Sequence, residues 1–173
     1  MHEERAANLL GAFAVTVSDL VLADATAAAG TSASGAAALV VLSTAPGLSV
    51  TELGRRVGLS QPAAARMVDS LEQRGLVERR DTLTRSVAVH LTRSGAGAAR
   101  TVLGDRGGRL ADLATALDQR EQATLAKLLG KLLTAACEHV PDADRLCRLC
   151  DRAACVAGGT TCPVGVACRE RDG

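Results

Sequence analysis

The chain has 173 residues, of which 47% are apolar but only 1% aromatic, with no Trp or Tyr and a single Phe. Its formal net charge is +1, so it lacks the strongly basic balance that announces nucleic-acid binding, and any such binding has to come from locally concentrated charge. The length suits one domain with an elaborated core, or a domain with a small appendage, and that core has to be built from Ala, Leu and Val.

Neither a membrane span nor an export signal is expected. Asp19 and Asp24 interrupt the most apolar early segment, which leaves no uninterrupted run of about 20 apolar residues. The chain starts with the acidic residues Glu3 and Glu4, whereas a secretory signal starts with a basic segment. We therefore expect a cytoplasmic protein with no membrane partner, in a compartment where thiols stay reduced.

The first 48 residues are expected to form dimerisation helices. Residues 5–29 are rich in Ala, Leu and Val and contain no Pro, which predicts a long helix that is apolar on more than one side. Such a helix needs a partner surface, and a second copy of the chain is the most economical source. Burial within the monomer is the alternative. A second helix is predicted over 36–44, ending before Pro46.

Two short capped helices follow. Ser49 and Glu52 have the spacing of a capping box, which opens a helix that stops at Gly58. Ser60 caps the next helix, which ends at Gly75. Two helices joined by a tight turn that contains Gly form a helix-turn-helix.

The pattern then changes to that of a hairpin. Residues 76–80 and 86–91 flank a polar loop, and the second segment alternates in character, which predicts two strands and a basic wing. Residues 49–93 carry eight Arg and five acidic residues, and eight minus five leaves a local excess of three positive charges. Because Arg can form two hydrogen bonds with a phosphate or a guanine edge, the module predicted over 49–92 has the chemistry for DNA binding.

The segment 59–79, LSQPAAARMVDSLEQRGLVER, followed by the hairpin and by LTRSG at 91–95, resembles the MarR family of transcriptional regulators. The resemblance covers residues 5 to 140 and is strongest over 49–95. It implies a mainly α fold with a small β wing: a winged helix-turn-helix with an intertwined helical dimerisation region. It also implies a homodimer that places two recognition helices in successive major grooves of a pseudo-palindromic DNA operator, and a repressor rather than an enzyme.

In proteins of this design the start of the recognition helix faces base edges and the wing reaches the flanking DNA. On this basis we predict DNA contacts from Ser60, Gln61, Arg66, Arg79, Arg80 and Arg85. Arg85 occupies the position of the family's wing-tip Arg. The Asp that usually precedes that Arg by two positions is Leu83 here, so Arg85 lacks its usual partner.

Residues 93–140 are expected to complete the dimerisation region. Thr92 caps a helix that continues to Leu117, although several Gly residues weaken it. Asp118 and Glu121 form a second capping box ahead of a helix with Leu at helical spacing. Leucines at this spacing indicate a core or a dimer interface.

The last segment, residues 141–173, holds five of the six cysteines: Cys147, Cys150, Cys155, Cys162 and Cys168. Cys147 and Cys150 are three apart, so on a helical turn their sulfurs face one side. The segment has too few large apolar residues for a core of its own, and a metal centre would organise it. Cys137, on the preceding helix, is expected to be a buried apolar residue.

Three interpretations of this tail compete. Structural zinc is usually held by two Cys-x2-4-Cys pairs, and only Cys147 with Cys150 fits. An iron–sulfur cluster accepts more irregular spacing, and a ligand Cys followed by Pro, as in Cys162-Pro163, occurs in ferredoxin-type sites. A metal-free thiol switch needs only two cysteines and leaves the others unexplained. We expect an iron–sulfur cluster, with zinc and the thiol switch as open alternatives.

The tail also resembles the cysteine-rich extension of a subset of MarR-like proteins. That resemblance implies the ligand set Cys147, Cys150, Cys155 and Cys162, with Cys168 as a spare. Asp151 and His139 are alternative ligands, although a cation at the end of a helix is the simpler interpretation of His139.

Regulation is expected to act through these cysteines, because MarR-like proteins commonly sense phenolic or lipophilic compounds and a chain with one aromatic residue has little to stack on them. We hypothesise that assembly, loss or oxidation of the cluster changes how the tail packs on the dimerisation helices and alters the spacing of the recognition helices. The alternatives outside gene regulation are a thiol oxidoreductase, which would need a thioredoxin-like alternation of strands and helices that the sequence lacks, and an electron carrier.

Overall fold

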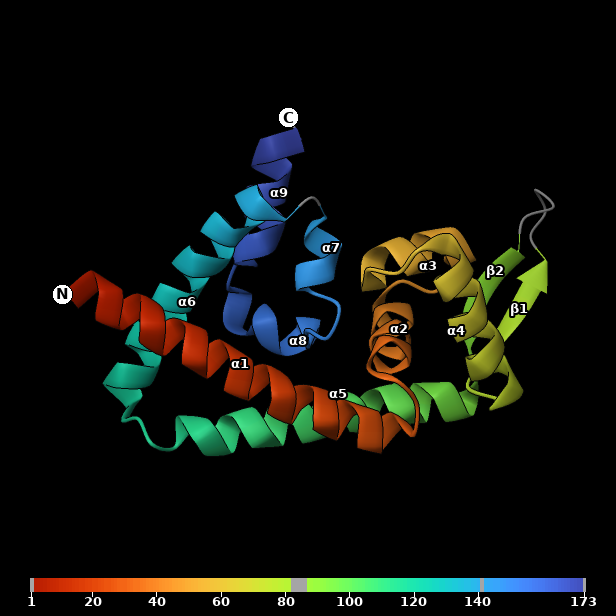
Figure 1. Ribbon diagram of the computed structural model, residues 1–173, viewed down its shortest axis with the longest axis horizontal. Coiled ribbons are helices and arrows are strands. Elements are labelled where there is room, and N and C mark those ends of the chain that lie inside the picture. Colours follow the sequence, from red (N-terminus) through yellow and green to blue (C-terminus); the bar gives the residue numbers. More distant parts are fainter. Residues whose placement is uncertain (1, 82–86, 141, 173) are drawn as a thin grey trace.

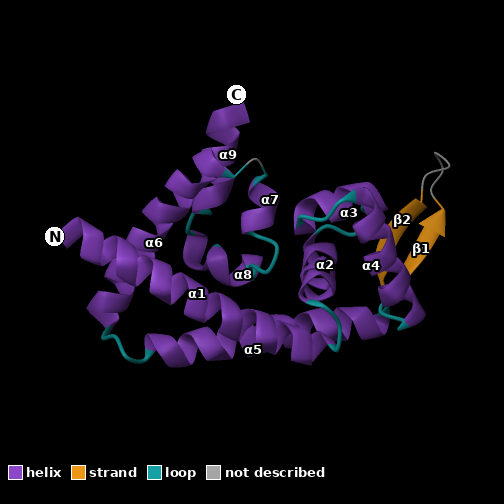
Figure 2. Cartoon of the chain, in the orientation of Figure 1, coloured by secondary structure: helices purple, strands orange, loops and turns teal. Residues whose placement is uncertain are grey.

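A computed structural model describes residues 2–81, 87–140 and 142–172 of the chain, with side chains placed from residue 3 to residue 167 outside those gaps. The described chain is mainly helical with one two-stranded sheet, as predicted (Figure 2). The elements in chain order are α1 (His2–Ala29), α2 (Ala33–Thr44), α3 (Val50–Val57), α4 (Gln61–Gln73), β1 (Val77–Asp81), β2 (Val87–Leu91), α5 (Arg93–Ala114), α6 (Gln119–His139), α7 (Ala143–Leu146), α8 (Arg152–Cys155), the 3-10 turn η1 (Ala157–Gly159) and α9 (Pro163–Asp172).

The long helices α1 and α5 lie alongside each other and join two groups of elements (Figure 1). At one end, α2, α3, α4 and the hairpin form the winged helix-turn-helix lobe. At the other end, α6 and the tail elements α7 to α9 fold together, with α9 packed on α6. An ion pair also holds the long helices together, since Arg109 of α5 donates to both carboxylate oxygens of Asp24 of α1 at 2.8 and 3.0 Å.

The core of the lobe is aliphatic, as the composition predicts. Helix α2 is buried on all sides over Gly35–Leu42, and it contacts α1, α3, α4, α5 and β2. The largest fully buried side chains are Leu39, Leu42, Leu53, Leu71, Val68, Val77, Val89 and Val102. Burying a side chain of this size contributes about 1.5–3 kcal/mol, so this cluster is the main source of the lobe's stability.

The helix-turn-helix is built largely from the predicted local signals. The Ser49 hydroxyl accepts a hydrogen bond from the Glu52 amide at 3.1 Å, and Gly58, with φ of 79°, ends α3. The capping box is only half formed, however. The Glu52 carboxylate accepts from Arg55 and Arg56 instead of from the Ser49 amide, because charged donors are the stronger partners.

Ser60 takes the N-cap position of α4, but its side chain makes no capping hydrogen bond. The hydroxyl is therefore not used by the helix it precedes. Asp118 and Glu121 form the complete capping box predicted for α6, and Thr92 caps α5 by accepting from the Gly95 amide at 3.1 Å.

The wing is an antiparallel hairpin whose register runs from Val77 opposite Leu91 to Asp81 opposite Val87. An additional bridge joins Leu48 to Val89 and anchors the hairpin beside the start of α3. The hairpin tip lies outside the described residues, and with it the predicted DNA contact of Arg85.

Helix α1 differs from expectation in one respect. An 18-residue window within Glu3–Ala29 has a mean hydropathy of 1.7, which makes this helix long and apolar enough to cross a membrane despite Asp19 and Asp24. One or two acidic residues lower the mean hydropathy over 18 residues only slightly. A helix that packs on other protein helices can have the same length and hydropathy as a helix that spans a membrane.

Two glycines of α5 give a matched test of this packing. A Cβ on Gly95 would lie 1.8 Å from the carbonyl oxygen of Leu76, whereas a Cβ on Gly97 would meet nothing within 4 Å. We predict that Gly95→Ala lowers the free energy of unfolding by about 3 kcal/mol, the upper end of overpacking costs. Gly97→Ala should raise it by about 0.5–1 kcal/mol through helix propensity. Urea unfolding measures both, and equal effects would contradict this packing.

Candidate nucleic-acid interface and cysteine site

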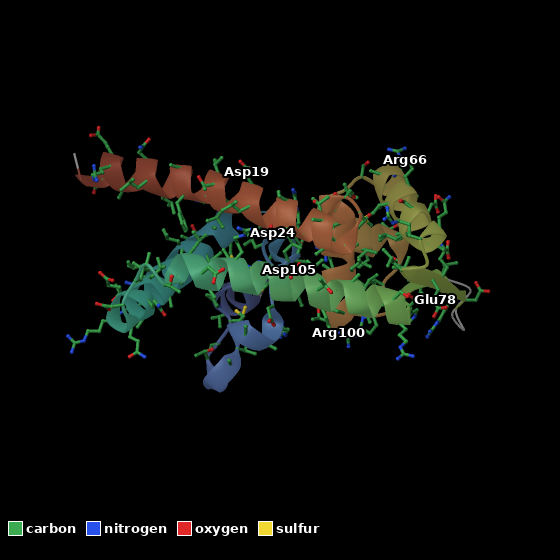
Figure 3. All side chains as sticks on the ribbon, turned by 90° about the horizontal axis from the view of Figure 1, so that it is seen from below. Asp19, Asp24, Arg66, Glu78, Arg100 and Asp105 are labelled. Carbon is green, nitrogen blue, oxygen red and sulfur yellow. The ribbon has the colours of Figure 1, made fainter. Side chains whose placement is uncertain are left out.

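The first turns of α4 present the polar side chains predicted to contact DNA. Ser60, Gln61 and Arg66 are all exposed, while Ala64, Met67, Val68 and Leu71 on the opposite face are buried. Arg66 extends away from the molecule (Figure 3). Within the part of the chain that the structure describes, no acidic side chain pairs with it, so its guanidinium is available to a ligand.

Arg79 is placed differently from Arg66. Its guanidinium pairs with Asp69 at 2.6 Å and with Glu72, and its backbone amide donates to Glu72 at 3.2 Å. The hydrogen bond that Arg79 donates to Asp69, together with the one it donates to Glu72, raises the pKa of Arg79. Arg79 therefore ties β1 to α4, and its charge is largely used inside the protein.

Arg80 is exposed and is paired with Glu78, two residues away on the same strand. An exposed pair of this kind contributes little to stability and can exchange its partner for another anion. Arg74 and Arg93 are also exposed and, among the described residues, make no ion pair. Fewer Arg side chains are consequently free to bind an anion than the number of Arg residues in the lobe suggests.

A second group of charges joins α3 to the tail. Arg55 pairs with Asp142 and, at 2.8 Å, with Asp144, and Arg56 lies 3.4 Å from the same Asp144 carboxylate. Glu52 bridges both arginines. The hydrogen bonds from Arg55 and then Arg56 lower the pKa of Glu52 to about 2. We call these five residues the α3–α7 ion-pair cluster. The sequence analysis did not find it, because no local pattern pairs residues almost 90 positions apart.

The four cysteines predicted as ligands meet around one cavity of about 340 Å³. Cys147, Cys150, Cys155 and Cys162 all line it and are all half-buried. The opposite wall comes from the lobe, and its residues are Val40, Val41, Thr44, Ala45 and Arg56. Asp144, Arg152 and Val156 complete the lining. The cysteine cavity therefore lies between the tail and the winged helix-turn-helix lobe.

The sulfurs are close enough to influence one another. The Cys147 thiol hydrogen-bonds to Cys150, which lowers the pKa of Cys150 to about 6, and the positive charge of Arg106 acts in the same direction. The same hydrogen bond raises the pKa of Cys147. Burial, followed by the charges of Cys150 and Cys162, raises the pKa of Cys155 to about 11.

One sulfur also receives a backbone donor. The amide of Gly165, at the start of α9, donates to the Cys162 sulfur at 3.4 Å. Hydrogen bonds to cysteine sulfur are among the features that set the properties of iron–sulfur sites. Arg56 and Arg152 line the cavity together with Asp144, and the positive charge of Arg106 favours the thiolate of Cys150.

The cysteine cavity is not arranged, among the described residues, as a ready site for a metal ion. Within the described residues, no three Cys, His, Asp or Glu side chains lie close enough together to hold one ion. A tetrahedral zinc site with Zn–S bonds of about 2.3 Å would need all four sulfurs at one point.

The alternative ligands are used elsewhere or point away. Asp151 caps α8 by accepting from the Ala154 amide at 3.1 Å, and His139 is exposed at the end of α6. Cys137 is 3% exposed, which confirms that it is a buried residue of α6. The side chain of Cys168 lies outside the described residues.

Comparisons with known proteins bear on the winged helix-turn-helix fold. Residues 29–84 match the sequence model described as the MarR family. A search of curated proteins finds no match. Among solved structures, the YusO protein from Bacillus subtilis is 24% identical with a TM-score of 0.66, over 77% of this chain and 95% of that one. The MarR family protein Rv2887 of Mycobacterium tuberculosis is 26% identical with a TM-score of 0.59, over 72% and 91% of the two chains.

A third neighbour, Streptococcus pneumoniae FabT in complex with DNA, is 19% identical with a TM-score of 0.66, over 80% of this chain and 99% of that one. FabT therefore shares the fold over most of this chain. The fold and the exposed recognition helix define a winged helix-turn-helix protein. Over residues 29–84 the chain resembles the MarR family, its described fold is that of winged helix-turn-helix proteins such as Rv2887, and a cysteine-rich C-terminal extension follows that fold.

The lowered pKa of Glu52 predicts a pH dependence of stability. A carboxyl group with a folded pKa of about 2 and an ordinary value of 4.5 stabilises the fold fully above pH 4.5. This contribution is lost as the pH falls toward 2. We predict that the free energy of unfolding, measured in urea between pH 7 and pH 3, falls less in Glu52→Gln than in the native protein. The same fall in both would contradict the role of the ion pairs.

Proposed function

We propose that the protein is a homodimeric DNA-binding transcriptional regulator, acting as a repressor, whose DNA binding is set by an iron–sulfur cluster held by the C-terminal cysteines. The observation that carries the DNA-binding part is the exposed, unpaired Arg66 on the recognition helix of a MarR fold. Two structural neighbours, Rv2887 and FabT, were solved in complex with DNA. A cytoplasmic location follows from this function.

The dimer is proposed from the unburied apolar surface of the terminal helices. Large apolar side chains are exposed on α1, α5 and α6, and they are Leu9, Leu10, Phe13, Val15, Leu113, Leu128, Leu129, Leu132 and Leu133. A soluble monomer rarely exposes so many neighbouring apolar groups. Pairing with the same helices of a second copy would cover them, and it would explain the hydropathy of α1 without a membrane.

Within this proposal the predicted DNA residues have different roles. Ser60, Gln61 and Arg66 face the major groove, where their hydroxyl, amide and guanidinium groups can bind base edges or phosphates. Arg80, on the exposed side of the hairpin, binds phosphate in exchange for Glu78. Arg79 holds the hairpin against α4 and acts as a positioning residue. Arg85 at the hairpin tip stays a predicted contact to the flanking DNA.

The cluster proposal is supported by the shared cavity and by the donors around it. Cys147, Cys150, Cys155 and Cys162 would be the ligands, and the Gly165 amide and nearby Arg side chains would offset their negative charge. Such a cluster supplies sensitivity to iron supply and to oxidants. Structural zinc and a metal-free thiol switch remain the alternatives, and they differ from the cluster in composition and colour.

Arg66 provides the direct test of the DNA-binding proposal. We predict that Arg66→Ala weakens binding to the operator, sought in the DNA upstream of the protein's own gene, by about 1–3 kcal/mol if Arg66 reads a base. Arg74→Ala is the matched control, because Arg74 lies at the other end of the same helix and should leave affinity nearly unchanged. Titrations at one fixed salt concentration measure both. Equal affinities for the native protein and Arg66→Ala would remove Arg66 from the interface.

The cysteine site is tested by composition. Protein purified without oxygen should be brown and contain iron and acid-labile sulfide in equal amounts. Cys150→Ser should lose both, while Cys168→Ser should retain them, because Cys168 is not one of the four ligands. A colourless native protein that contains zinc would contradict the cluster and support the structural alternative.

A further inference from the structure

The tail reaches the DNA-binding lobe directly. Its first helix, α7, packs against α3, the first helix of the helix-turn-helix. The α3–α7 ion-pair cluster joins them, with Arg55 held by both Asp142 and Asp144. The side chain of Asp142 is 13% exposed, whereas that of Arg55 is 47% exposed, so the cluster is only partly shielded from water.

Two further contacts hold the tail against the rest of the protein. Leu149, which lies between the proposed ligands Cys147 and Cys150, packs against the hydrophobic core and shares a groove with Val21 of α1 and Leu110 of α5. The guanidinium of Arg145 lies over Gly58, where an added Cβ would be 2.8 Å from the Arg145 Nε atom. Gly58 is the residue that ends α3 and starts the turn into α4. The tail therefore contacts the helix-turn-helix along α3 and at its turn, and it meets the long helices through Leu149.

Helix α3 is in turn closely packed on the recognition helix. An added Cβ on Gly54 would lie 2.5 Å from the Cβ of Ala64, so only glycine allows this approach. The Leu59 amide also donates to the Gly54 carbonyl at 2.8 Å, which fixes the turn. Ala64 is in the first turns of α4, close to Ser60 and Gln61. Because a close-packed contact transmits displacement, a shift of α3 has to move the DNA-facing end of α4.

We propose that α7 is the coupling element of the protein: the α3–α7 ion-pair cluster and the contact of Arg145 with Gly58 link the occupancy of the cysteine cavity to the position of the recognition helix within the same protomer. This inference rests on the proposed function. It differs from a mechanism in which the tail acts only through the dimerisation helices, because Cys147 immediately follows α7. Binding a centre at Cys147 and Cys150 holds the end of α7 in place, and loss of that centre releases it from α3.

Asp142→Asn/Asp144→Asn is the variant that tests the coupling. It removes both tail charges, yet Asn at position 142 still serves as an N-cap for α7. The matched control is Asp24→Asn/Asp112→Asn, which removes two carboxylates that act on the exposed Arg109 of α5, away from α3 and α7. Each pair is combined with Cys147→Ser/Cys150→Ser in a double-mutant cycle, with all proteins purified without oxygen.

The readout that decides the inference is hydrogen exchange of the α3 amides, residues 50–57, which needs no DNA. In the native background, Cys147→Ser/Cys150→Ser should speed α3 exchange at least about fivefold, a typical coupling between sites. In the Asp142→Asn/Asp144→Asn background the same cysteine change should have less than half that effect, while in the control background the effect should be complete. Removing metal from the native chain with a chelator should reproduce the cysteine result without any substitution.

The coupling would be overturned if the cysteine change had the same effect on α3 exchange in the native and the Asp142→Asn/Asp144→Asn backgrounds. It would also be overturned if the cysteine change left α3 exchange unaltered in the native background. Operator affinity of the same proteins is measured in parallel. Failure of the native protein to bind any DNA would refute the proposed function, and the exchange cycle would still decide whether α7 couples the two sites.

Discussion

The structure depends on the burial of α2 among helices that approach it closely. With no Trp or Tyr and one Phe, the chain fills its core with Ala, Val and Leu, and the residues Ala36–Leu42 are buried on every side of the helix. Small side chains allow short distances between helix axes. Every element of the lobe contacts α2 or a neighbour of α2, and Val40, Val41, Thr44 and Ala45 also form one wall of the cysteine cavity. One helix thus supports both candidate sites.

Charge is distributed in the lobe so that few Arg residues remain for DNA. Four of the arginines over 49–93 have acidic partners inside the protein: Arg55, Arg56, Arg79 and Arg80. Arg79 orients the hairpin, and Arg55 and Arg56 bind the tail. Arg66, on the recognition helix, has no acidic partner among the described residues and can bind DNA. A nearly neutral protein can therefore present a local positive surface while using the other arginines to position it.

The sequence was sufficient for features with a local signal. Ser49, Thr92 and Asp118 cap the helices they were expected to cap, since a cap depends on residues within four positions. The hairpin and the burial of Cys137 were also correct. The predicted hydrogen bond from the Ser49 amide to Glu52 was wrong, because the helix brings Arg55 and Arg56 close to Glu52 and their charged groups are the stronger donors. The gathering of four cysteines followed from their number and from resemblance, but their position against α2 and α3 could not, because it depends on Leu149 and on ion pairs between distant segments.

The central claim is that the cysteine tail controls DNA binding through its contact with the lobe. Its most direct test is a titration of the native protein's promoter DNA by two preparations of one sample, one kept as purified without oxygen and one stripped of metal by a chelator, at a single salt concentration. The account predicts affinities that differ at least about fivefold, the lower end of typical couplings between sites. Equal affinities in the two preparations, with metal analysis confirming that only one is stripped, would contradict it.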